Sequence, residues 1–182
     1  NLFTDGTNEL TKSISNYLNV DYKHHNKYFL NLTAALDASS RFGSEVEGSI
    51  DLLGTTWAFF PSASAAWLVS SETFMKDLGW LNHFKLRTGI DRTGNDDIMP
   101  YQSEAYFTAI RFKSVANGMI LNNLANPSIK WETTSRVYAG TDIGLANDRI
   151  HLNFDVYKAV TTDLLVRKDV PEVAGLTWYT TN

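Results

Sequence analysis

Hydrophobic and polar residues alternate along the stretch from Trp131 to Val160, and this alternation organises the interpretation of the whole chain. The odd-numbered positions of its first half form one face: Trp131, Thr133, Ser135, Val137, Ala139, Thr141 and Ile143. The even-numbered positions from Glu132 to Asp142 carry mostly polar residues, and alternation returns after a turn at 145–148. Because successive side chains of a strand point to opposite faces, the two halves predict one long β-hairpin.

Both arms of this hairpin exceed the usual strand length of about 5–6 residues. They also reach the ~9–11 residues that a tilted strand needs to cross a bilayer. Asn147 and Asp148 in the turn tolerate the positive φ that tight hairpins require. The length of the arms is the first indication of a membrane location.

The same alternation predicts strands over 13–22, 28–38, 57–70 and 82–91, and a further strand within 105–112. Pro61 interrupts one of them, and because proline cannot donate to a ladder it predicts a strand start, a bulge or an edge. Apolar side chains at helical spacing predict one short helix near 72–78, with Ser70 or Ser71 as its N-cap and Gly79 as its end. The segments 39–55, 93–130 and 161–182 are interpreted as long connections.

Short and long connections alternate along the chain. In an up-and-down meander, successive turns lie at opposite ends, so all the short connections share one end and all the long ones share the other. This asymmetry is typical of an outer-membrane barrel with short periplasmic turns and long extracellular loops. Tyr22, Tyr28 and Trp67 near the short turns, and Trp131 at the other end, fit aromatic girdles at the two interfaces.

The amino-acid composition narrows the possible classes of protein further. The 182-residue chain has a net charge of −4 and a pI of about 5.5, so it lacks the basic charge that is typical of nucleic-acid-binding proteins. It has no cysteine, which excludes disulfides and thiolate metal sites. No stretch approaches the ~18 consecutive apolar residues of a membrane-spanning helix. A transmembrane barrel is not excluded, because the alternating residues of its strands average out in any hydropathy window. The chain begins at Asn1 and is expected to be a mature piece or an internal fragment.

Six segments, in order, resemble motifs of the SusC/RagA-type TonB-linked outer-membrane proteins. The matching segments are 37–43 (DASSRFG), 59–67 with 71–75 (FFPSASAAW, SETFM), 86–95 (LRTGIDRTGN), 126–134 (NPSIKWETT), 148–157 (DRIHLNFDVY) and 162–165 (TDLL). Ala38 stands where that family usually has glycine, and 44–54 looks expanded. The resemblance covers the chain from about Asp37 to Leu165.

The resemblance implies an all-β, antiparallel, up-and-down transmembrane barrel of about 22 strands with an N-terminal plug. Residues 1–182 would supply about six strands of the barrel domain, without the plug, the TonB-contacting segment or the closing strand. It also implies import of glycan oligomers or peptides across the outer membrane of a Bacteroidetes-type Gram-negative bacterium. The implied partners are a SusD-like surface lipoprotein, the TonB–ExbB–ExbD complex, outer-membrane lipid and the substrate, with no nucleic acid.

Two sets of residues are candidates for functional contacts. Charged residues at every second position are expected to line a wet lumen: His83, Lys85, Arg87, Asp91, Glu132, Arg136, Asp142, His151 and Asp155. Aromatic residues in or beside the long connections are candidates for contacts with a ligand or partner: Trp57, Tyr101, Tyr106, Trp178 and Tyr179. No nucleophile motif, phosphate loop or Ser/His/Asp spacing stands out, so the chain is not expected to be an enzyme.

The sequence gives little support for a metal-binding site. His24 and His25 are adjacent, and in a strand they would point to opposite faces, which disfavours joint ligation. Asp91, Asp96 and Asp97 could help to bind Ca²⁺ in an extracellular loop, but they lack the alternating ligand spacing of a calcium loop. No cofactor is therefore expected.

A soluble β-sandwich lectin or adhesin remains an alternative, because its strands also alternate. Its apolar faces would pack on each other instead of on lipid, and its charged faces would point to bulk water. A third possibility is a non-energised porin. Solubility without detergent would favour the sandwich, whereas a plug encoded upstream would exclude the porin.

Overall fold

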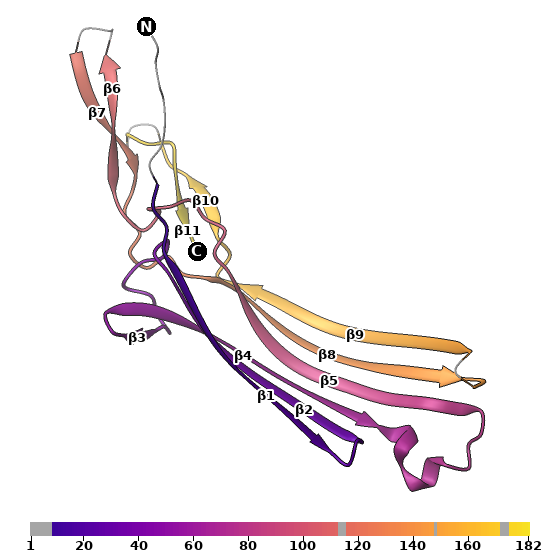
Figure 1. Ribbon diagram of the computed structural model, residues 1–182. Coiled ribbons are helices and arrows are strands. Elements are labelled where there is room, and N and C mark those ends of the chain that lie inside the picture. Colours follow the sequence, from indigo (N-terminus) through magenta and orange to yellow (C-terminus); the bar gives the residue numbers. More distant parts are fainter. Residues whose placement is uncertain (1–8, 113–115, 148, 172–174) are drawn as a thin grey trace, which may run out of the picture.

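A curved antiparallel sheet dominates the computed structural model, which describes residues 9–112, 116–147, 149–171 and 175–182 (Figure 1). Its main strands are β1 (Ser13–His24), β2 (Tyr28–Ser39), β4 (Thr55–Leu68), β5 (Leu81–Asn95), β8 (Glu132–Leu145) and β9 (Ile150–Thr162). They lie in the order β1-β2-β4-β5-β8-β9, so each main strand pairs with the next one along the chain. The predicted up-and-down meander is confirmed.

Two tight turns close the sheet at one end, which we call the short-turn end. The β1–β2 turn places His25 and Asn26 at φ values of 49° and 57°. The β8–β9 turn places Ala146 and Asn147 at 54° and 59°. Ala146 therefore occupies a left-handed position that the sequence assigned to Asn and Asp, and Asp148 lies outside the described residues.

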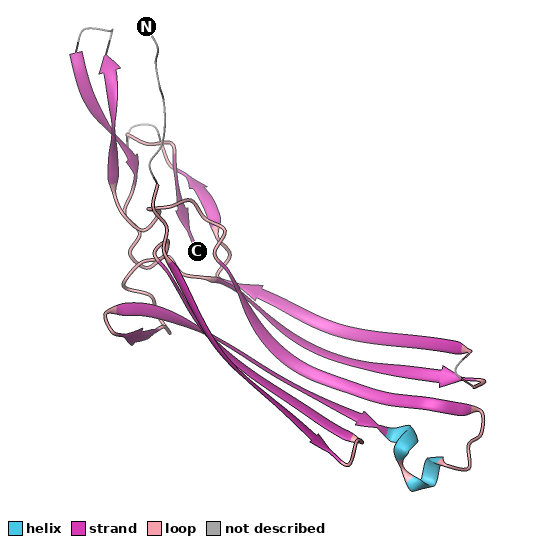
Figure 2. Ribbon diagram, in the orientation of Figure 1, coloured by secondary structure: helices cyan, strands magenta, loops and turns pink. Residues whose placement is uncertain are grey.

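The predicted short helix near 72–78 is confirmed in its place but not as one capped helix. The connection between β4 and β5 holds two single turns of 3₁₀-helix instead, η1 (Val69–Ser71) and η2 (Thr73–Met75), shown in cyan in Figure 2. Glu72 between them is extended, with φ −75° and ψ 152°, and no side chain caps either turn. Phe74 is 65% exposed, so an amphipathic helix would have no apolar surface on which to pack.

Pro61 lies inside β4, at the point where β4 and β5 part. The ladder between them runs only from Ser62 to Leu68, so Pro61 is the first residue of β4 outside it. Towards the other end of the sheet, β4 pairs with the short strand β3 (Ile50–Leu52), and β5 continues beside β8 as far as Asn95. The expectation that Pro61 marks an edge is confirmed for the β5 side of β4.

The long connections gather at the opposite end of the sheet, the long-loop end (Figure 1). Two extra hairpins form there: β6 (Tyr106–Phe112) with β7 (Ala116–Asn123), and β10 (Val166–Asp169) with β11 (Trp178–Thr181). Only β6 was predicted, because the other three strands are short or lack a regular alternation. Neither hairpin joins the main sheet.

The buried apolar side chains concentrate at the long-loop end. They are Ala38, Phe42, Trp57, Phe60, Ile129 and, at the short-turn end, Val69. Trp131 packs against Phe42 and Phe60, with ring centroids 4.7 and 5.6 Å away, so it belongs to this cluster of side chains. That it is also part of an aromatic girdle stays a prediction. No helix among the described residues is long and apolar enough to span a membrane.

Candidate functional site

The register of the sheet brings all nine predicted lumen residues to one face, which we call the polar face. His83, Lys85, Arg87 and Asp91 of β5 share it with Glu132, Arg136 and Asp142 of β8 and with His151 and Asp155 of β9. The ladders align His83 with Gly144 and His151, and Lys85 with Asp142. That this face lines a lumen stays a prediction.

An ion-pair cluster on the polar face spans three strands. The Arg87 guanidinium donates from Nη2 to Asp142 Oδ1 at 2.9 Å and to Asp155 Oδ1 at 3.1 Å. Gly140 of β8 stands between Arg87 and Asp155 in the register. A Cβ on Gly140 would lie 2.0 Å from Asp155 Oδ1. The absence of a side chain at Gly140 therefore leaves the space in which side chains of β5 and β9 meet above the backbone of β8.

A second pair repeats this arrangement nearer the long-loop end. Arg136 Nε donates to Asp91 Oδ2 at 2.9 Å, and its guanidinium lies 5.7 Å from the centre of the Tyr138 ring. Tyr138 in turn lies over Gly89, where a Cβ would come within 2.6 Å of the Tyr138 hydroxyl. Most of these charges are therefore matched by opposite charges across the strands.

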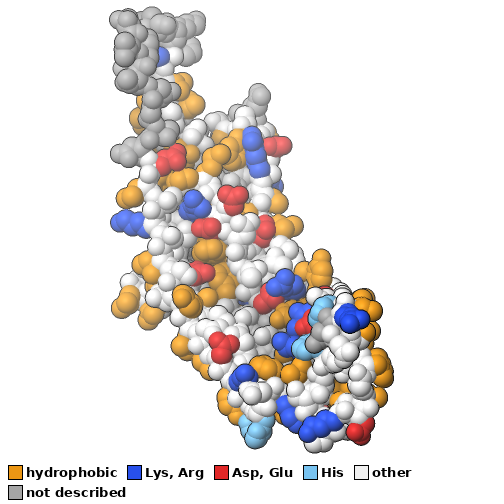
Figure 3. Space-filling view, turned by 45° about the vertical axis from the view of Figure 1, so that its right-hand side comes forward, with side chains coloured by type: hydrophobic (Ala, Val, Ile, Leu, Met, Phe, Trp, Pro, Cys, Tyr) orange, Lys and Arg blue, Asp and Glu red, His pale blue; other side chains and the backbone are white. Residues whose placement is uncertain are grey.

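The remaining predicted lumen residues are less tightly held. Lys85 Nζ lies 5.3 Å from the centre of the Phe29 ring. Glu132 accepts from the backbone N–H of Leu165 at 3.2 Å and thereby links β8 to the connection after β9. The face shown in Figure 3 carries acidic and basic side chains interspersed.

The polar face is hollowed between β2 and β8. A cavity of about 530 Å³ is lined by residues of β2, β4, β5 and β8, among them Asn31, Asp37, Ser64, Asp91 and Tyr138. Asn31 and Asp37 also bond to β1, through Asp21 and Ser15. The lining offers hydroxyl, amide and charged groups of both signs, which suits a hydrogen-bonding polar ligand.

The opposite face, which we call the apolar face, is uncovered. Leu18, Val137 and Phe154 on it are 66%, 57% and 64% exposed. A β-sandwich would bury such side chains against a second sheet. Among the described residues no second sheet lies on this face, since both extra hairpins stand at the long-loop end.

The five candidate aromatic residues differ in their availability. Trp57 is 8% exposed, and its indole N–H donates to the carbonyl of Leu52 at 3.2 Å within its own hairpin. Tyr101 is exposed, and its hydroxyl accepts from the N–H of Leu10. Tyr106, Trp178 and Tyr179 are half-buried, and the Arg167 guanidinium stacks 4.0 Å from the centre of the Trp178 ring. Contact with a ligand or partner stays a prediction for all five.

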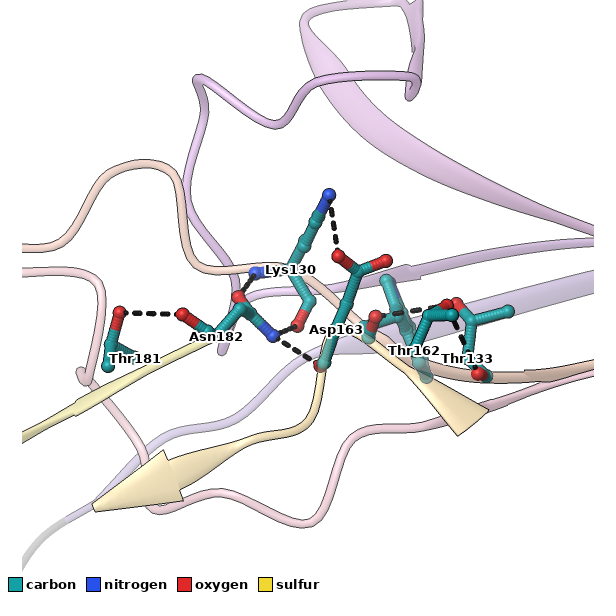
Figure 4. A network of polar contacts seen from close by, with 7 residues as sticks. Lys130, Thr133, Thr162, Asp163, Thr181 and Asn182 are labelled. Atoms are coloured by element: carbon teal, nitrogen blue, oxygen red, sulfur yellow. Dashed lines mark hydrogen bonds and ion pairs between the residues drawn. The ribbon is translucent and has the colours of Figure 1, made fainter. Parts of the chain in front are cut away.

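Polar side chains that sequence reasoning missed tie the long connections together. Asn182 Nδ2 donates to the carbonyls of Lys130 and Asp163, and its Oδ1 accepts from the Lys130 N–H (Figure 4). The Lys130 ammonium pairs with the Asp163 carboxylate at 3.0 Å. Buried Asn123 donates to three carbonyls, and buried Gln102 accepts from the Thr180 hydroxyl. The Asn-rich composition of 117–126 was the only available signal.

A single carboxylate organises the short-turn end. Glu72 accepts from Lys27 Nζ at 2.8 Å, from the Tyr28 hydroxyl at 2.8 Å and from the Trp67 indole at 3.2 Å. These hydrogen bonds, that of Lys27 foremost, lower the pKa of Glu72 to about 2. Tyr28 and Trp67, two of the predicted girdle residues, stack on each other, with ring centroids 6.3 Å apart.

The candidate metal ligands His24, His25, Asp91 and Asp96 all contact other side chains. The rings of His24 and His25 pack edge to face 4.0 Å apart, because His25 lies in the left-handed turn. Because His25 lies in the turn and not in the strand, the argument from opposite strand faces does not apply to this pair. Asp91 pairs with Arg136, and Asp96 pairs with Arg41 at 3.5 Å. The described residues contain no group of three or more His, Asp or Glu side chains that could hold a metal ion.

Comparison with known proteins places the chain among large receptors. No protein-family model matches it. It is 34% identical over 169 residues to TonB-dependent receptor P3 of Formosa agariphila, a match that covers 91% of this chain and 16% of the relative. It is 30% identical over 165 residues to TonB-dependent receptor SusC of Bacteroides thetaiotaomicron, covering 87% of this chain and 16% of SusC.

Solved structures show the same relation. The RagAB peptide importer in its closed-closed state superposes with a TM-score of 0.81 at 25% identity, over 93% of this chain and 18% of that one. A second structure of RagAB, the peptide transporter, gives a TM-score of 0.81 at 24% identity, over 94% of this chain and 18% of that one. The chain spans about one sixth of the length of the curated relatives it matches.

Proposed function

We propose a function from the premise that this chain belongs to the TonB-dependent receptors of the SusC and RagA type, of which it covers one segment. The proposed function is nutrient import across the outer membrane, with residues 1–182 forming six neighbouring strands of the barrel wall. The observation that carries it is one sheet with an exposed apolar face and a charged polar face. Its main strands are 12 to 15 residues long, enough to cross a bilayer.

The exposed apolar face supports a wall that meets lipid. In water, so many exposed apolar side chains on one sheet would promote association. In hydrocarbon, exposed apolar side chains are stable. The unpaired backbone N–H and C=O groups at the outer edges of β1 and β9 then need hydrogen-bonding partners. We propose that other strands of the whole receptor pair with these two edges and close the barrel.

The polar face supports a water-filled lumen for the substrate. Its ion pairs place positive and negative side chains next to each other, and hydroxyl and amide groups lie between the pairs. Such a surface suits uncharged or mixed-charge oligomers. RagAB is described as a peptide transporter. For this protein we propose glycan oligomers or peptides as substrates, with no covalent chemistry on them.

The proposed partners follow from the same family. A SusD-like surface lipoprotein would cover the long-loop end. The TonB–ExbB–ExbD complex would supply energy through a plug-bearing part of the receptor outside this chain. The soluble sandwich is not favoured, because the apolar face has no second layer among the described residues.

The test is deletion of the whole gene in its own bacterium, followed by measurement of growth on purified oligosaccharides and peptides. We expect growth to be lost on one class of oligomer and restored by the intact gene. Unchanged growth on every substrate tried, with the protein present in the wild type, would contradict the proposal.

A second experiment tests the assignment of the two faces. Val156→Lys puts a cation on the apolar face of β9, which costs about 2–4 kcal/mol near the middle of a membrane. Asn153→Lys puts the same cation on the polar face. We expect little assembled receptor in the outer membrane for Val156→Lys and a near-normal amount for Asn153→Lys. Equal assembly of the two variants would refute the assignment.

A further inference from the structure

Within the six main strands, all of whose residues the structure describes, the apolar face carries only two Lys or Arg side chains and no acidic one. Following the register across the six main strands, which are described over their full length, the two are Arg92 of β5 and Lys158 of β9. The acidic residues of these strands all lie on the polar face: Asp21, Asp37, Asp91, Glu132, Asp142 and Asp155. The sorting of charge by face leaves a purely cationic pair on the apolar side.

The two cationic residues lie on the two strands that flank β8, at positions only two residues apart along β8. Arg92 is aligned with Ser135 and Lys158 with Val137, close to the long-loop ends of their strands. Strand spacing and rise place their Cα atoms about 12 Å apart, within reach of one headgroup for two long side chains. Neither side chain has an ion pair or hydrogen bond among the described residues. Basic side chains near the end of a membrane-spanning element extend towards headgroups.

An apolar hollow begins beside Arg92 and runs across the face. Its volume is about 620 Å³, and its lining includes Leu18, Leu32, Pro61, Ile90, Val137 and Arg92. The hollow exists because β4 contributes the small side chains of Pro61 and Ala63 between the larger ones of β2 and β5. A cation at the outer end of an apolar hollow matches a molecule with an anionic head and an acyl tail.

We propose that the apolar face binds a net-anionic phosphorylated lipid, with its phosphate between Arg92 and Lys158 and an acyl chain in the hollow. The guanidinium can donate two parallel hydrogen bonds to phosphate oxygens, and the ammonium adds a second positive charge. The proposal rests on the proposed function, because it requires the apolar face to meet membrane lipid. A zwitterionic lipid carries its own ammonium beside the phosphate and gains less from the two side chains.

The experiment uses the full-length receptor, delipidated in detergent and offered equal amounts of dimyristoyl phosphatidylglycerol and dimyristoyl phosphatidylcholine. These probes share their acyl chains and differ in net charge. Native mass spectrometry measures how much of each lipid stays bound. We expect preference for the anionic lipid to fall about fivefold for Arg92→Gln or Lys158→Gln and about 30-fold for both.

Two controls keep the result specific. Lys23→Gln removes a cation from the polar face and should leave the preference unchanged. Arg92→Lys with Lys158→Arg keeps both charges, so the preference should persist even if the neutral double variant fails to assemble. Equal retention of the two lipids by the wild type, or an unchanged preference in the assembled Gln variants, overturns the proposal.

Uptake measured on the same strains separates this proposal from the proposed function. A receptor that imports its substrate but binds both lipids equally would disprove the lipid site alone. A receptor that keeps the lipid preference but imports nothing would disprove the import function alone.

Discussion

The two ends of the sheet are held by different chemistry. At the short-turn end, the carboxylate of Glu72 gathers donors from the β1–β2 turn, from β2 and from β4. At the long-loop end, uncharged amide side chains join segments that share no ladder: Gln102, Asn123, Asn126 and Asn182.

The contrast follows from the length of the connections. Short turns leave few backbone groups without a ladder, so one charged acceptor suffices to fasten them. Long connections expose many N–H and C=O groups, and an amide side chain can donate and accept at once. The short-turn end should therefore respond to acid, whereas the long-loop end should respond to changes of shape.

The largest effect is expected at Gly43 in the long-loop end. A Cβ there would lie 1.7 Å from the carbonyl oxygen of Pro127, a backbone atom that cannot move aside alone. Gly43→Ala should lower the local opening free energy of segments 40–49 and 126–131 by about 3 kcal/mol, measured by hydrogen exchange in the full receptor. Gly79→Ala is the matched control at the short-turn end, where nothing lies within 4 Å. Equal effects of the two would erase the difference between the ends.

Asn123 gives the next largest effect. Its Nδ2 lies 2.7 Å from the carbonyl of Glu104 and within 3.3 Å of two others, and the residue is 2% exposed. Asn123→Ala should cost about 2 kcal/mol of local stability in 101–104, because three carbonyls lose their donor and that of Gln102 is buried. The exposed neighbour Asn122 is the control, and Asn122→Ala should change the same exchange rates little.

Acid should loosen the short-turn end. The pKa of Glu72 is about 2 in the folded protein and 4.5 ordinarily, so its stabilising effect is complete above about pH 4.5. The effect declines as the pH falls towards 2 and the carboxylate is protonated. The Trp67 fluorescence, taken as the difference between wild type and Trp67→Phe, should shift over this range. Glu72→Gln should abolish the shift, and a shift that survives it would refute the assignment.

The smallest effect is expected for the Lys130–Asp163 ion pair. Both side chains are about one third exposed, so Lys130→Met should cost only about 0.5 kcal/mol. High salt should remove most of the difference between wild type and variant, because screening weakens an exposed pair. Hydrogen exchange of Asp163 and its neighbours at low and high salt measures this. A cost that is independent of salt would show that packing, not charge, holds this contact.

Sequence patterns predicted the sheet well and the long connections poorly. The alternation along 131–160 depends on neighbouring residues in one strand, and the two faces follow from it directly. The contacts of Asn123 and Asn182 join residues far apart in the chain, and no local pattern announces them. The helix near 72–78 is present only as separate 3₁₀ turns for a related reason, since its spacing was right but Phe74 remains exposed.

The sequence by itself determined the six main strands, their order and the charge of each face, because side-chain alternation and short turns are local properties. Only the tertiary structure decided which charges meet. It placed Gly140 between Arg87 and Asp155, and it ended the β4–β5 ladder at Pro61. It also left Arg92 and Lys158 as the only Lys or Arg side chains on the apolar face of the six main strands. Register across strands is a long-range property, set by how whole strands pair, so it appears only when they are side by side.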